Sequence, residues 1–253
     1  MVERKNKSHY IQDLLEIIRC DYPFCHSINT QRILDIFATV TKYVSKGKKL
    51  LDIGCGSCSI VAAISNADYE CHACDDFQDP WHLDDDNYKK IKRYAEINNI
   101  SLTKMDLSEG LPYSDFSFDA VLLIDVLEHL HNSPKKILAE MSRVLKPGGY
   151  VFIGTPNSAN LRKRIHLLLG GTNYPSLEQF YFSGDKWRGH IREYTPDEVL
   201  WLLSAGNFEL IELKMCHWML ENRISGIKKI LYFLVTTVIS KAKDSILVVG
   251  QKC

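Results

Sequence analysis

The sequence predicts an α/β protein built on a doubly wound, mostly parallel seven-stranded sheet. Two observations predict this fold. Strand-like and helix-like segments alternate from residue 48 to about residue 210, and polar residues recur where the strands end. Such alternation gives parallel strands joined by right-handed helical crossovers. We expect N-terminal helices in 1–47 and a main domain at 48–253, with insertions at 157–195 and 218–244, the latter a helical insertion before the last strand.

The individual elements follow from the spacing of apolar residues. Thr195 is expected to cap a helix that Gly206 ends. A helix stop is expected at Lys146-Pro147-Gly148-Gly149. Helices are predicted at 9–19, 28–45, 60–66, 88–98, 134–145 and 196–205, and strands at 48–53, 69–74, 102–105, 118–124, 150–154, 208–215 and 246–249.

Composition restricts the partners and the compartment. Lys plus Arg and Asp plus Glu each number 31, so no net field attracts nucleic acid, and no nucleic-acid partner is expected. Residues 1–7 are polar and charged, which does not suit a signal peptide. No stretch reaches the ~18 apolar residues that span a bilayer. The eight cysteines then indicate reduced thiols in the cytoplasm.

A glycine-rich turn follows the first predicted strand, where residues 51–56 read Leu-Asp-Ile-Gly-Cys-Gly. Glycines let the backbone approach a ligand that a Cβ atom would block. A dinucleotide fingerprint needs a third glycine, and Cys58 stands there instead. Asp75 follows the second strand, where a carboxylate accepts from the two hydroxyls of a ribose. The pattern favours an adenosine-type ligand, and its alternative is a tight turn without a ligand.

Several segments then resemble, in order, the motifs of class I S-adenosylmethionine-dependent methyltransferases. Residues 51–56 resemble the first motif of that family, and Asp75 its ribose-binding acid. Met105-Asp106-Leu107 is similar to the segment beside adenine, and residues 118–130 to the fourth strand and the turn after it.

The resemblance continues through the fifth strand and covers about residues 48–215. Residues 143–150 match the helix end before that strand. Thr155-Pro156-Asn157 is similar to the strand's end in the subgroup related to ubiquinone-biosynthesis methyltransferases. The resemblance implies a Rossmann-like methyltransferase fold with S-adenosylmethionine as the cofactor. It places the cofactor against Asp52, Gly54, Gly56, Asp75, Asp76, Asp106, Leu107 and Asp125.

Two segments are candidates for acceptor binding and catalysis. Asp76 to His82 forms an extra loop after the ribose-binding acid, in which Trp81 and His82 are expected to reach the cofactor or the substrate, or to pin a surface loop. Gly189-His190-Ile191-Arg192-Glu193-Tyr194-Thr195 follows the fifth strand. The predicted bases are His190 and His129. The predicted substrate contacts are Trp81, His82, Asn157, Arg192 and Tyr194, although Glu193 and Tyr194 also suit a loop tied to the sheet.

Two patterns raise the question of a metal. Asp125-x-x-Glu128-His129 with His190 is a plausible divalent-cation set, which resembles the metal site of small-RNA 3′-end 2′-O-methyltransferases. Glu-His-Leu at this position is nevertheless common in family members without a metal. Cys55-x-x-Cys58 and Cys71-x-x-Cys74 have zinc-ribbon spacing, but Cys71 and Cys74 would point to opposite faces of a strand. We expect no bound metal.

Two basic or amphipathic segments keep alternative interpretations. Ile227, Ile230, Leu231, Leu234, Val235 and Val238 form one helical stripe, which is expected to pack on the domain or a second subunit, or to touch a membrane interface through 226–243. Arg162-Lys163-Arg164 suits a phosphate contact or a solvated helix face.

The predicted activity is methylation of a small-molecule, glycan or lipid-linked acceptor, with oxygen favoured as the methyl-accepting atom. The resulting protein would be cytoplasmic or peripheral to the inner face of a membrane. One alternative is an RNA 2′-O-methyltransferase with a metal site, which the neutral net charge opposes. The other is a non-catalytic partner subunit that keeps the fold.

Overall fold

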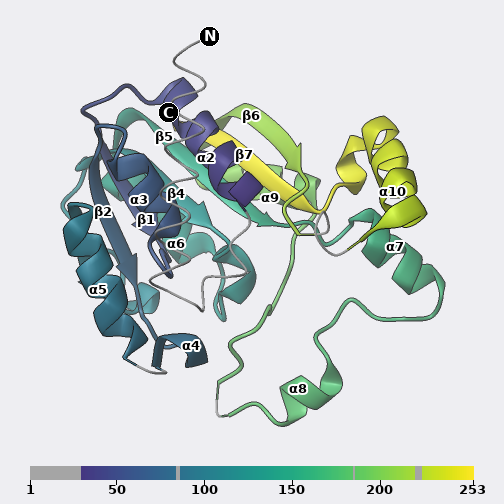
Figure 1. Ribbon diagram of the computed structural model, residues 1–253. Coiled ribbons are helices and arrows are strands. Elements are labelled where there is room, and N and C mark those ends of the chain that lie inside the picture. Colours follow the sequence, from purple (N-terminus) through teal and green to yellow (C-terminus); the bar gives the residue numbers. More distant parts are fainter. Residues whose placement is uncertain (1–29, 84–85, 185, 220–223) are drawn as a thin grey trace. The chain divides into compact units, whose positions relative to one another are not determined.

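The structure is a computed structural model that describes residues 30–83, 86–184, 186–219 and 224–253 (Figure 1). The helix predicted at 9–19 lies outside the described residues. The chain divides into two compact units. Unit 1 extends to Leu122 and includes Arg143–Tyr150, and unit 2 comprises Leu123–Ser142 and Val151–Cys253.

The strands form a seven-stranded sheet in the order β3-β2-β1-β4-β5-β7-β6. Strand β2 pairs in parallel with β1 and with β3, whereas β6 and β7 pair antiparallel. The predicted doubly wound, mostly parallel sheet is therefore confirmed. The strands are β1 (Lys49–Ile53), β2 (Glu70–Asp75), β3 (Ile100–Lys104), β4 (Phe118–Ile124), β5 (Leu145–Pro156), β6 (Phe208–Cys216) and β7 (Ser245–Lys252).

In unit 1, apolar helix faces cover the parallel strands. Helix α2 (Thr30–Tyr43) buries Ile33, Ile36, Phe37 and Val40, which share one face at helical spacing. Helix α3 packs on β2, and α5 packs on β3. The remaining elements of this unit are α3 (Ser59–Ser65), α4 (Pro80–Leu83), α5 (Asn87–Ile97) and the 3-10 turn η2 (Leu107–Glu109).

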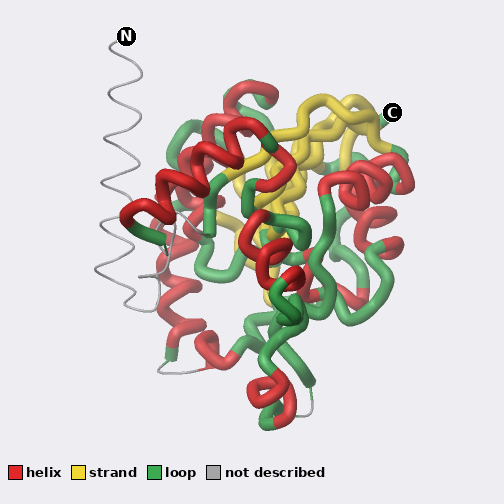
Figure 2. Tube along the Cα trace, turned by 90° about the vertical axis from the view of Figure 1, so that its right-hand side faces the viewer, coloured by secondary structure: helices red, strands yellow, loops and turns green. Residues whose placement is uncertain are grey.

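In unit 2, helix α9 (Pro196–Ala205) packs against β6 and β7. The predicted cap is confirmed, because Thr195 and Glu198 form a reciprocal capping box and Gly206 ends the helix. Figures 1 and 2 both show α8 at the end of long loops, away from the strands of its unit. The other helices are α6 (Lys135–Val144), α7 (Leu161–Leu168), α8 (Leu177–Tyr181) and α10 (Gly226–Val238), with the 3-10 turns η3 (Leu127–His129) and η4 (Ser240–Ala242).

Strand β5 begins at Leu145, five residues earlier than predicted. The expected helix stop is confirmed, because α6 ends at Val144. The chain then extends directly, and Lys146 forms an ion pair of 2.8 Å with Asp119. Glycine suits the close approach that follows, since a Cβ atom on Gly149 would lie 3.0 Å from the carbonyl oxygen of Asp119.

The apolar stripe of α10 does not pack on its own domain, so that part of the prediction is wrong. Ile227, Leu234 and Val238 are 72%, 61% and 85% exposed, and the buried residues of this helix are Tyr232 and Thr236. The predicted position of the helix, between the last two strands, is confirmed. Among the described residues, no helix is both long and apolar enough to cross a bilayer.

Candidate active site

The turn after β1 requires a left-handed backbone at two glycines. Gly54 and Gly56 have φ angles of 71° and 51°, a region that side chains with a Cβ atom disfavour. The Gly54 amide donates to the carbonyl of Cys74 at 2.8 Å, which joins the turn to β2. Cys58, at the third position of the motif, is also left-handed with a φ of 61° and is buried. The turn therefore keeps its sharp form without a third glycine.

Asp75 ends β2 beside this turn, where a carboxylate was predicted to bind a ribose. One oxygen of its carboxylate accepts from the Gly56 amide at 2.9 Å, and the other accepts from the Phe77 amide at 2.8 Å. These bonds fix the orientation of the carboxylate. A carboxylate held in this way is a suitable acceptor for the hydroxyls of a ribose.

The loop after Asp75 brings one aromatic side chain to the glycine turn. A Cβ atom on Gly56 would lie 3.8 Å from the Trp81 ring, so the indole is next to the turn. His82 is only 2% exposed, and its ring packs edge-on against Phe77 at 5.1 Å. Trp81 is well placed to contact a ligand of the turn. The structure places His82 in the interior, and the substrate contact predicted for it stays untested.

Asp52 is the buried carboxyl of this region, with 3% of its surface exposed. Burial, and to a lesser degree the charge of Asp75, raises the pKa of Asp52 to about 7, while Arg32 acts in the opposite direction. The carboxyl is therefore partly protonated at neutral pH, which distinguishes it from an ordinary surface aspartate.

The other predicted cofactor residues of unit 1 lie at the ends of β2 and β3. Asp106 accepts from the Ser108 amide at 2.8 Å and caps the turn that contains Leu107. The Met105 amide donates to the carbonyl of Asp75 at 2.9 Å, which brings the two strand ends together. Asp76 is half-buried and accepts from the Gln78 amide.

The expected cofactor fits these residues. The left-handed glycine turn exposes backbone for close approach, and Asp75 offers acceptor positions to two hydroxyls. These two features match a ribose-bearing ligand. The contacts predicted for Asp52, Gly54, Gly56, Asp75, Asp76, Asp106 and Leu107 stay predictions.

Burial favours the thiol form at three of the four cysteines with zinc-ribbon spacing. Burial raises the pKa of Cys71 to about 12 and also raises the pKa of Cys55 and of Cys74. Zinc binds thiolates, and the raised pKa values of these three cysteines oppose thiolate formation. The Cys55 and Cys58 sulfurs lie 3.6 Å apart within the glycine turn.

Unit 2 holds the second group of predicted residues, which begins directly after β4. Asp125 has a φ of 54°, a strained conformation for a residue other than glycine, and its amide donates to the carbonyl of Gly154 at 2.8 Å. Glu128 is fully buried, and its carboxylate accepts from the Thr155 hydroxyl at 2.9 Å. Strand β5 therefore supplies the partner that orients Glu128.

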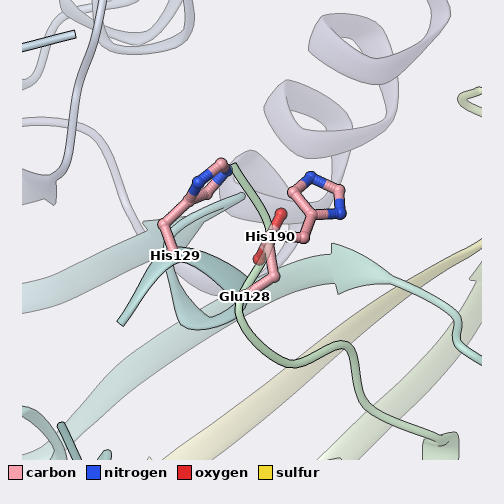
Figure 3. Close-up of side chains that lie close together, drawn as sticks. All are labelled: Glu128, His129 and His190. Carbon is pink, nitrogen blue, oxygen red and sulfur yellow. The ribbon is translucent and has the colours of Figure 1, made fainter. Parts of the chain in front are cut away.

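Two histidines distant in sequence meet beside Glu128. The rings of His129 and His190 lie 4.9 Å apart, edge to face. Figure 3 shows the Glu128 carboxylate between them. The carbonyl of Glu128 also accepts from the Ile191 amide at 2.6 Å, and so binds the 187–193 loop to the turn after β4.

His190 is held in its neutral form. Burial, and then the charges of His129 and Lys163, lower the pKa of its imidazole to about 4. The Nδ1–H of His190 donates to Glu193 at 2.8 Å. A base works best with a pKa near the working pH, so this shift weakens the predicted general-base role.

Three predicted substrate contacts have structural partners in unit 2. Asn157 is buried, and its amide donates to the carbonyls of Lys241 and Lys243. Tyr194 is 6% exposed and pairs with Asn157 through the backbone. Arg192 forms an ion pair with Glu198 at 2.7 Å. These bonds favour the interpretation that the loop is tied to the sheet, and the three substrate contacts stay untested.

Sequence reasoning missed Lys163, which it treated as a phosphate contact or a solvated helix face. Its ammonium forms an ion pair with Glu193. Burial lowers the pKa of Lys163 to about 8. A cavity of about 130 Å³ lies here, lined by Pro156, Asn160, Arg162, Lys163, Glu193, Met219 and Asp244. Its volume is well below the ~300 Å³ of pockets for drug-sized ligands.

The sequence profile of a methyltransferase domain matches residues 51–153. Among curated relatives, the ubiquinone biosynthesis O-methyltransferase of Rickettsia akari (strain Hartford) is 24% identical over 202 residues, which cover 77% of this chain and 73% of that protein. The enzyme of the same name from Shewanella pealeana is 30% identical over 148 residues, covering 57% and 58%.

Solved structures of methyltransferases share the fold. An S-adenosylmethionine-dependent methyltransferase from Methanosarcina mazei aligns with a TM-score of 0.59 at 20% identity, covering 85% of this chain and 96% of that one. The 1,6-didemethyltoxoflavin-N1-methyltransferase of Burkholderia thailandensis, with bound S-adenosylhomocysteine, aligns with a TM-score of 0.56 at 15% identity, covering 96% and 89%.

Proposed function

We propose, on the premise that this chain belongs to the class I S-adenosylmethionine-dependent methyltransferases, that it methylates a hydroxyl oxygen of an acceptor carried on a lipid-like molecule. Its cofactor is S-adenosylmethionine. The cofactor supplies an activated methyl group on a sulfonium. The chain must bind and orient the acceptor oxygen and exclude water from it.

The observation that carries the lipid-like acceptor is a set of exposed apolar side chains in the 157–195 insertion. Leu168 and Leu169 at the end of α7 are 85% and 81% exposed. Large exposed apolar patches indicate a contact with a protein, a ligand or a membrane. The same insertion also exposes Leu167, Tyr174, Leu177, Phe180, Tyr181 and Phe182.

Helix α10 adds a second exposed apolar face in the same unit. Ile227, Leu234 and Val238 lie on it, and Lys228 and Lys229 lie beside them. Apolar residues next to lysines are typical of helices that lie in a membrane interface. We therefore propose peripheral contact with an anionic membrane surface through 226–243, which would bring the enzyme to a lipid-borne acceptor at the inner face of that membrane.

Oxygen as the methyl-accepting atom is supported by the relatives, several of which are named ubiquinone biosynthesis O-methyltransferases. These names describe the activity of the relatives, which are 24–30% identical to this chain. The acceptor head group of this protein is therefore proposed as a class: a hydroxyl on a small ring or sugar that bears an apolar tail.

Methyl transfer from labelled S-adenosylmethionine tests the proposal. The acceptors are a hydroxylated aromatic with a polyprenyl tail, the same head group without its tail, and a free sugar. We expect transfer to the tailed compound at the highest kcat/KM. Equal rates with and without the tail would contradict the lipid-like acceptor. No transfer to any acceptor by protein that binds the cofactor would contradict the proposed activity as a whole.

A pair of matched variants tests the exposed apolar surface. Leu168→Glu should lower activity on acceptor embedded in anionic vesicles, and lower cosedimentation with those vesicles, because it places a charge within the apolar surface. Ile97→Glu is the control, since Ile97 on α5 of the other unit is 70% exposed. Equal vesicle binding by both variants would show that the 157–195 insertion does not take part in the proposed membrane contact.

A further inference from the structure

We propose that Glu128, His129 and His190 form a binding site for one divalent first-row transition-metal ion. Each of the three side chains offers one ligand atom, and these atoms all lie within 4.8 Å of one another. Figure 3 shows that the three side chains come from two segments, the turn after β4 and the loop that carries His190.

The spacing suits a single cation after a small adjustment. Metal–nitrogen and metal–oxygen bonds of ~2.1 Å place two ligand atoms of one ion at most ~4.2 Å apart. His129 is the exposed member of the three, whereas Glu128 is fully buried. A movement of the exposed His129 would bring the three ligand atoms within bonding distance of one ion, and the buried Glu128 would stay in place.

Both histidine rings have the outer hydrogen bond that orients a metal-binding imidazole. Nδ1 of His129 lies 3.0 Å from the carbonyl oxygen of Arg188, and Nδ1 of His190 lies 2.8 Å from Glu193. Each of these acceptors requires a proton on Nδ1, which leaves Nε2 with the lone pair that a metal uses. A ligating histidine almost always has such a carbonyl or carboxylate partner.

The carboxylate ligand is oriented in the same way. The Thr155 hydroxyl donates to one oxygen of Glu128 at 2.9 Å, in a fully buried hydrogen bond. The backbone of Glu128 is fixed as well, because its carbonyl accepts from the Ile191 amide. Burial of a carboxylate is less costly when charge of the opposite sign lies near it. Lys163 interacts electrostatically with Glu128, and a divalent cation would add to that compensation.

The donor set indicates which cations fit. Two imidazoles and one carboxylate suit zinc, iron, cobalt, nickel or manganese, whereas magnesium and calcium prefer oxygen ligands alone. The described residues bring together three of the four side chains weighed from the sequence, without Asp125. Three ligands leave coordination positions open, as in catalytic rather than structural metal sites. An open position would accept water or, if the proposed function holds, the hydroxyl oxygen of the acceptor.

Metal binding is measured first, on the full chain without cofactor or acceptor. Protein stripped with a chelator is titrated with Zn²⁺, Mn²⁺ or Co²⁺ and followed by calorimetry and by equilibrium dialysis with elemental analysis. We expect one ion per chain for at least one of the three, undisturbed by excess Mg²⁺. Absence of stoichiometric binding by all three ions, in protein that is folded and binds S-adenosylmethionine, overturns the proposal.

Variants locate the site. Glu193→Gln and Thr155→Val should weaken binding by the ~10–100-fold typical of an outer partner, and loss of a ligand in Glu128→Gln, His129→Ala or His190→Ala should weaken it more. The control is His131→Ala, because Nε2 of His131 bonds the Trp187 carbonyl at 2.8 Å in the same loop contact without belonging to the cluster. Equal affinity in His129→Ala and His131→Ala would overturn the assignment.

The same experiments separate this proposal from the proposed function. Stoichiometric metal binding that depends on Glu128, without methyl transfer to any acceptor, would support the metal site and contradict the activity. Full methyl transfer by metal-free protein, with no metal bound on titration, would support the activity and contradict the metal site. His129→Ala keeps the test decisive if Glu128→Gln does not fold, because His129 is exposed.

Discussion

The glycine turn and the Glu128 cluster differ in how the chain builds them. The glycine turn and Asp75 lie at the ends of two neighbouring strands, β1 and β2, and the turn is defined by backbone angles and amide hydrogen bonds. The cluster joins the turn after β4 to a loop some 60 residues further along, as in the bond between His129 and Arg188. The first region is local, and the second depends on contacts between distant segments.

This difference decides what a sequence reveals about each region. A left-handed backbone selects for glycine, so the requirement at Gly54 and Gly56 is visible in the residue types themselves. No comparable rule couples Glu128 to Thr155 or His190 to Glu193, because many polar residues at those positions would look equally ordinary in sequence. Four substitutions test whether the regions differ as sharply in their response to change.

The largest effect of a substitution is expected at Asp75, beside the glycine turn. Asp75→Ala removes the carboxylate that faces the turn. Hydrogen bonds to a charged group contribute about 1.5–3 kcal/mol each, so loss of two should weaken cofactor affinity by roughly 100-fold or more. Calorimetric titration with S-adenosylmethionine measures the loss.

Two further variants serve as controls for the effect of Asp75→Ala on cofactor affinity. Asp75→Asn keeps one acceptor oxygen and should fall between the wild type and Asp75→Ala. Glu70→Ala, which removes an exposed carboxylate at the start of the same strand, should bind the cofactor normally. Unchanged affinity in folded Asp75→Ala would refute the assignment of Asp75 to the ribose.

A slightly smaller effect is expected at Asp52, and it depends on pH. The folded carboxyl has a pKa of about 7, against 3.8 for an unperturbed aspartate. Between these values the unfolded chain releases a proton that the folded chain retains, so the free energy of unfolding falls as pH rises from about 4 to 7. A shift of this size corresponds to at most about 4 kcal/mol.

Asp52→Asn removes that titration. The variant without cofactor should be more stable than the wild type at pH 8, by about 2–3 kcal/mol after the loss of ionic contacts, and should show little gain at pH 4.5. Urea unfolding at the two pH values measures the difference. A gain of equal size at both pH values would show that the buried charge of Asp52 is not its cause.

Most of the fold could be predicted from the sequence, because its signals are also local. The strand at 118–124 and the helix at 196–205 were predicted to the residue. An apolar run marks the strand, and the cap Thr195 and the stop Gly206 mark the helix. The early start of β5 was missed, because Pro147 and Gly149 resemble a turn when the close approach of Gly149 to Asp119 is unknown. Helix α8 was missed because it has only five residues, too few for the helical spacing of Leu177, Phe180 and Tyr181 to be distinctive.

The candidate site was predicted in part. The sequence grouped Glu128, His129 and His190 with Asp125 as a possible cation set, but favoured base catalysis by the two histidines and no metal. The contacts of Glu128 with Thr155 and with the 187–193 loop are known only from the structure. Lys163 was interpreted as a phosphate contact or part of a solvated helix face because it lies in a run of three basic residues, yet its ion pair with Glu193 holds it largely away from solvent. In both cases the missing information is a contact between distant segments.

A moderate effect is expected at Thr195, where the loop of the cluster enters α9. Thr195→Ala removes a hydroxyl that accepts from the Glu198 amide, one half of the capping box. Loss of such a cap typically costs about 1 kcal/mol of stability. Thermal unfolding measures the cost, and Thr195→Ser should restore it. A larger loss, accompanied by loss of metal binding, would show that the cap also holds the cluster.

The smallest effect is expected at Arg192, although the sequence made it a prominent candidate for substrate binding. Its guanidinium is 64% exposed and pairs with Glu198, which Thr195 also binds. An exposed ion pair contributes about 0–1 kcal/mol, so Arg192→Ala should change stability and kcat little. Methyl-transfer kinetics with the best acceptor provide the measurement. If KM instead rises more than tenfold while stability is unchanged, Arg192 binds the acceptor, and the distant-contact region would then be as sensitive to one side chain as the glycine turn is.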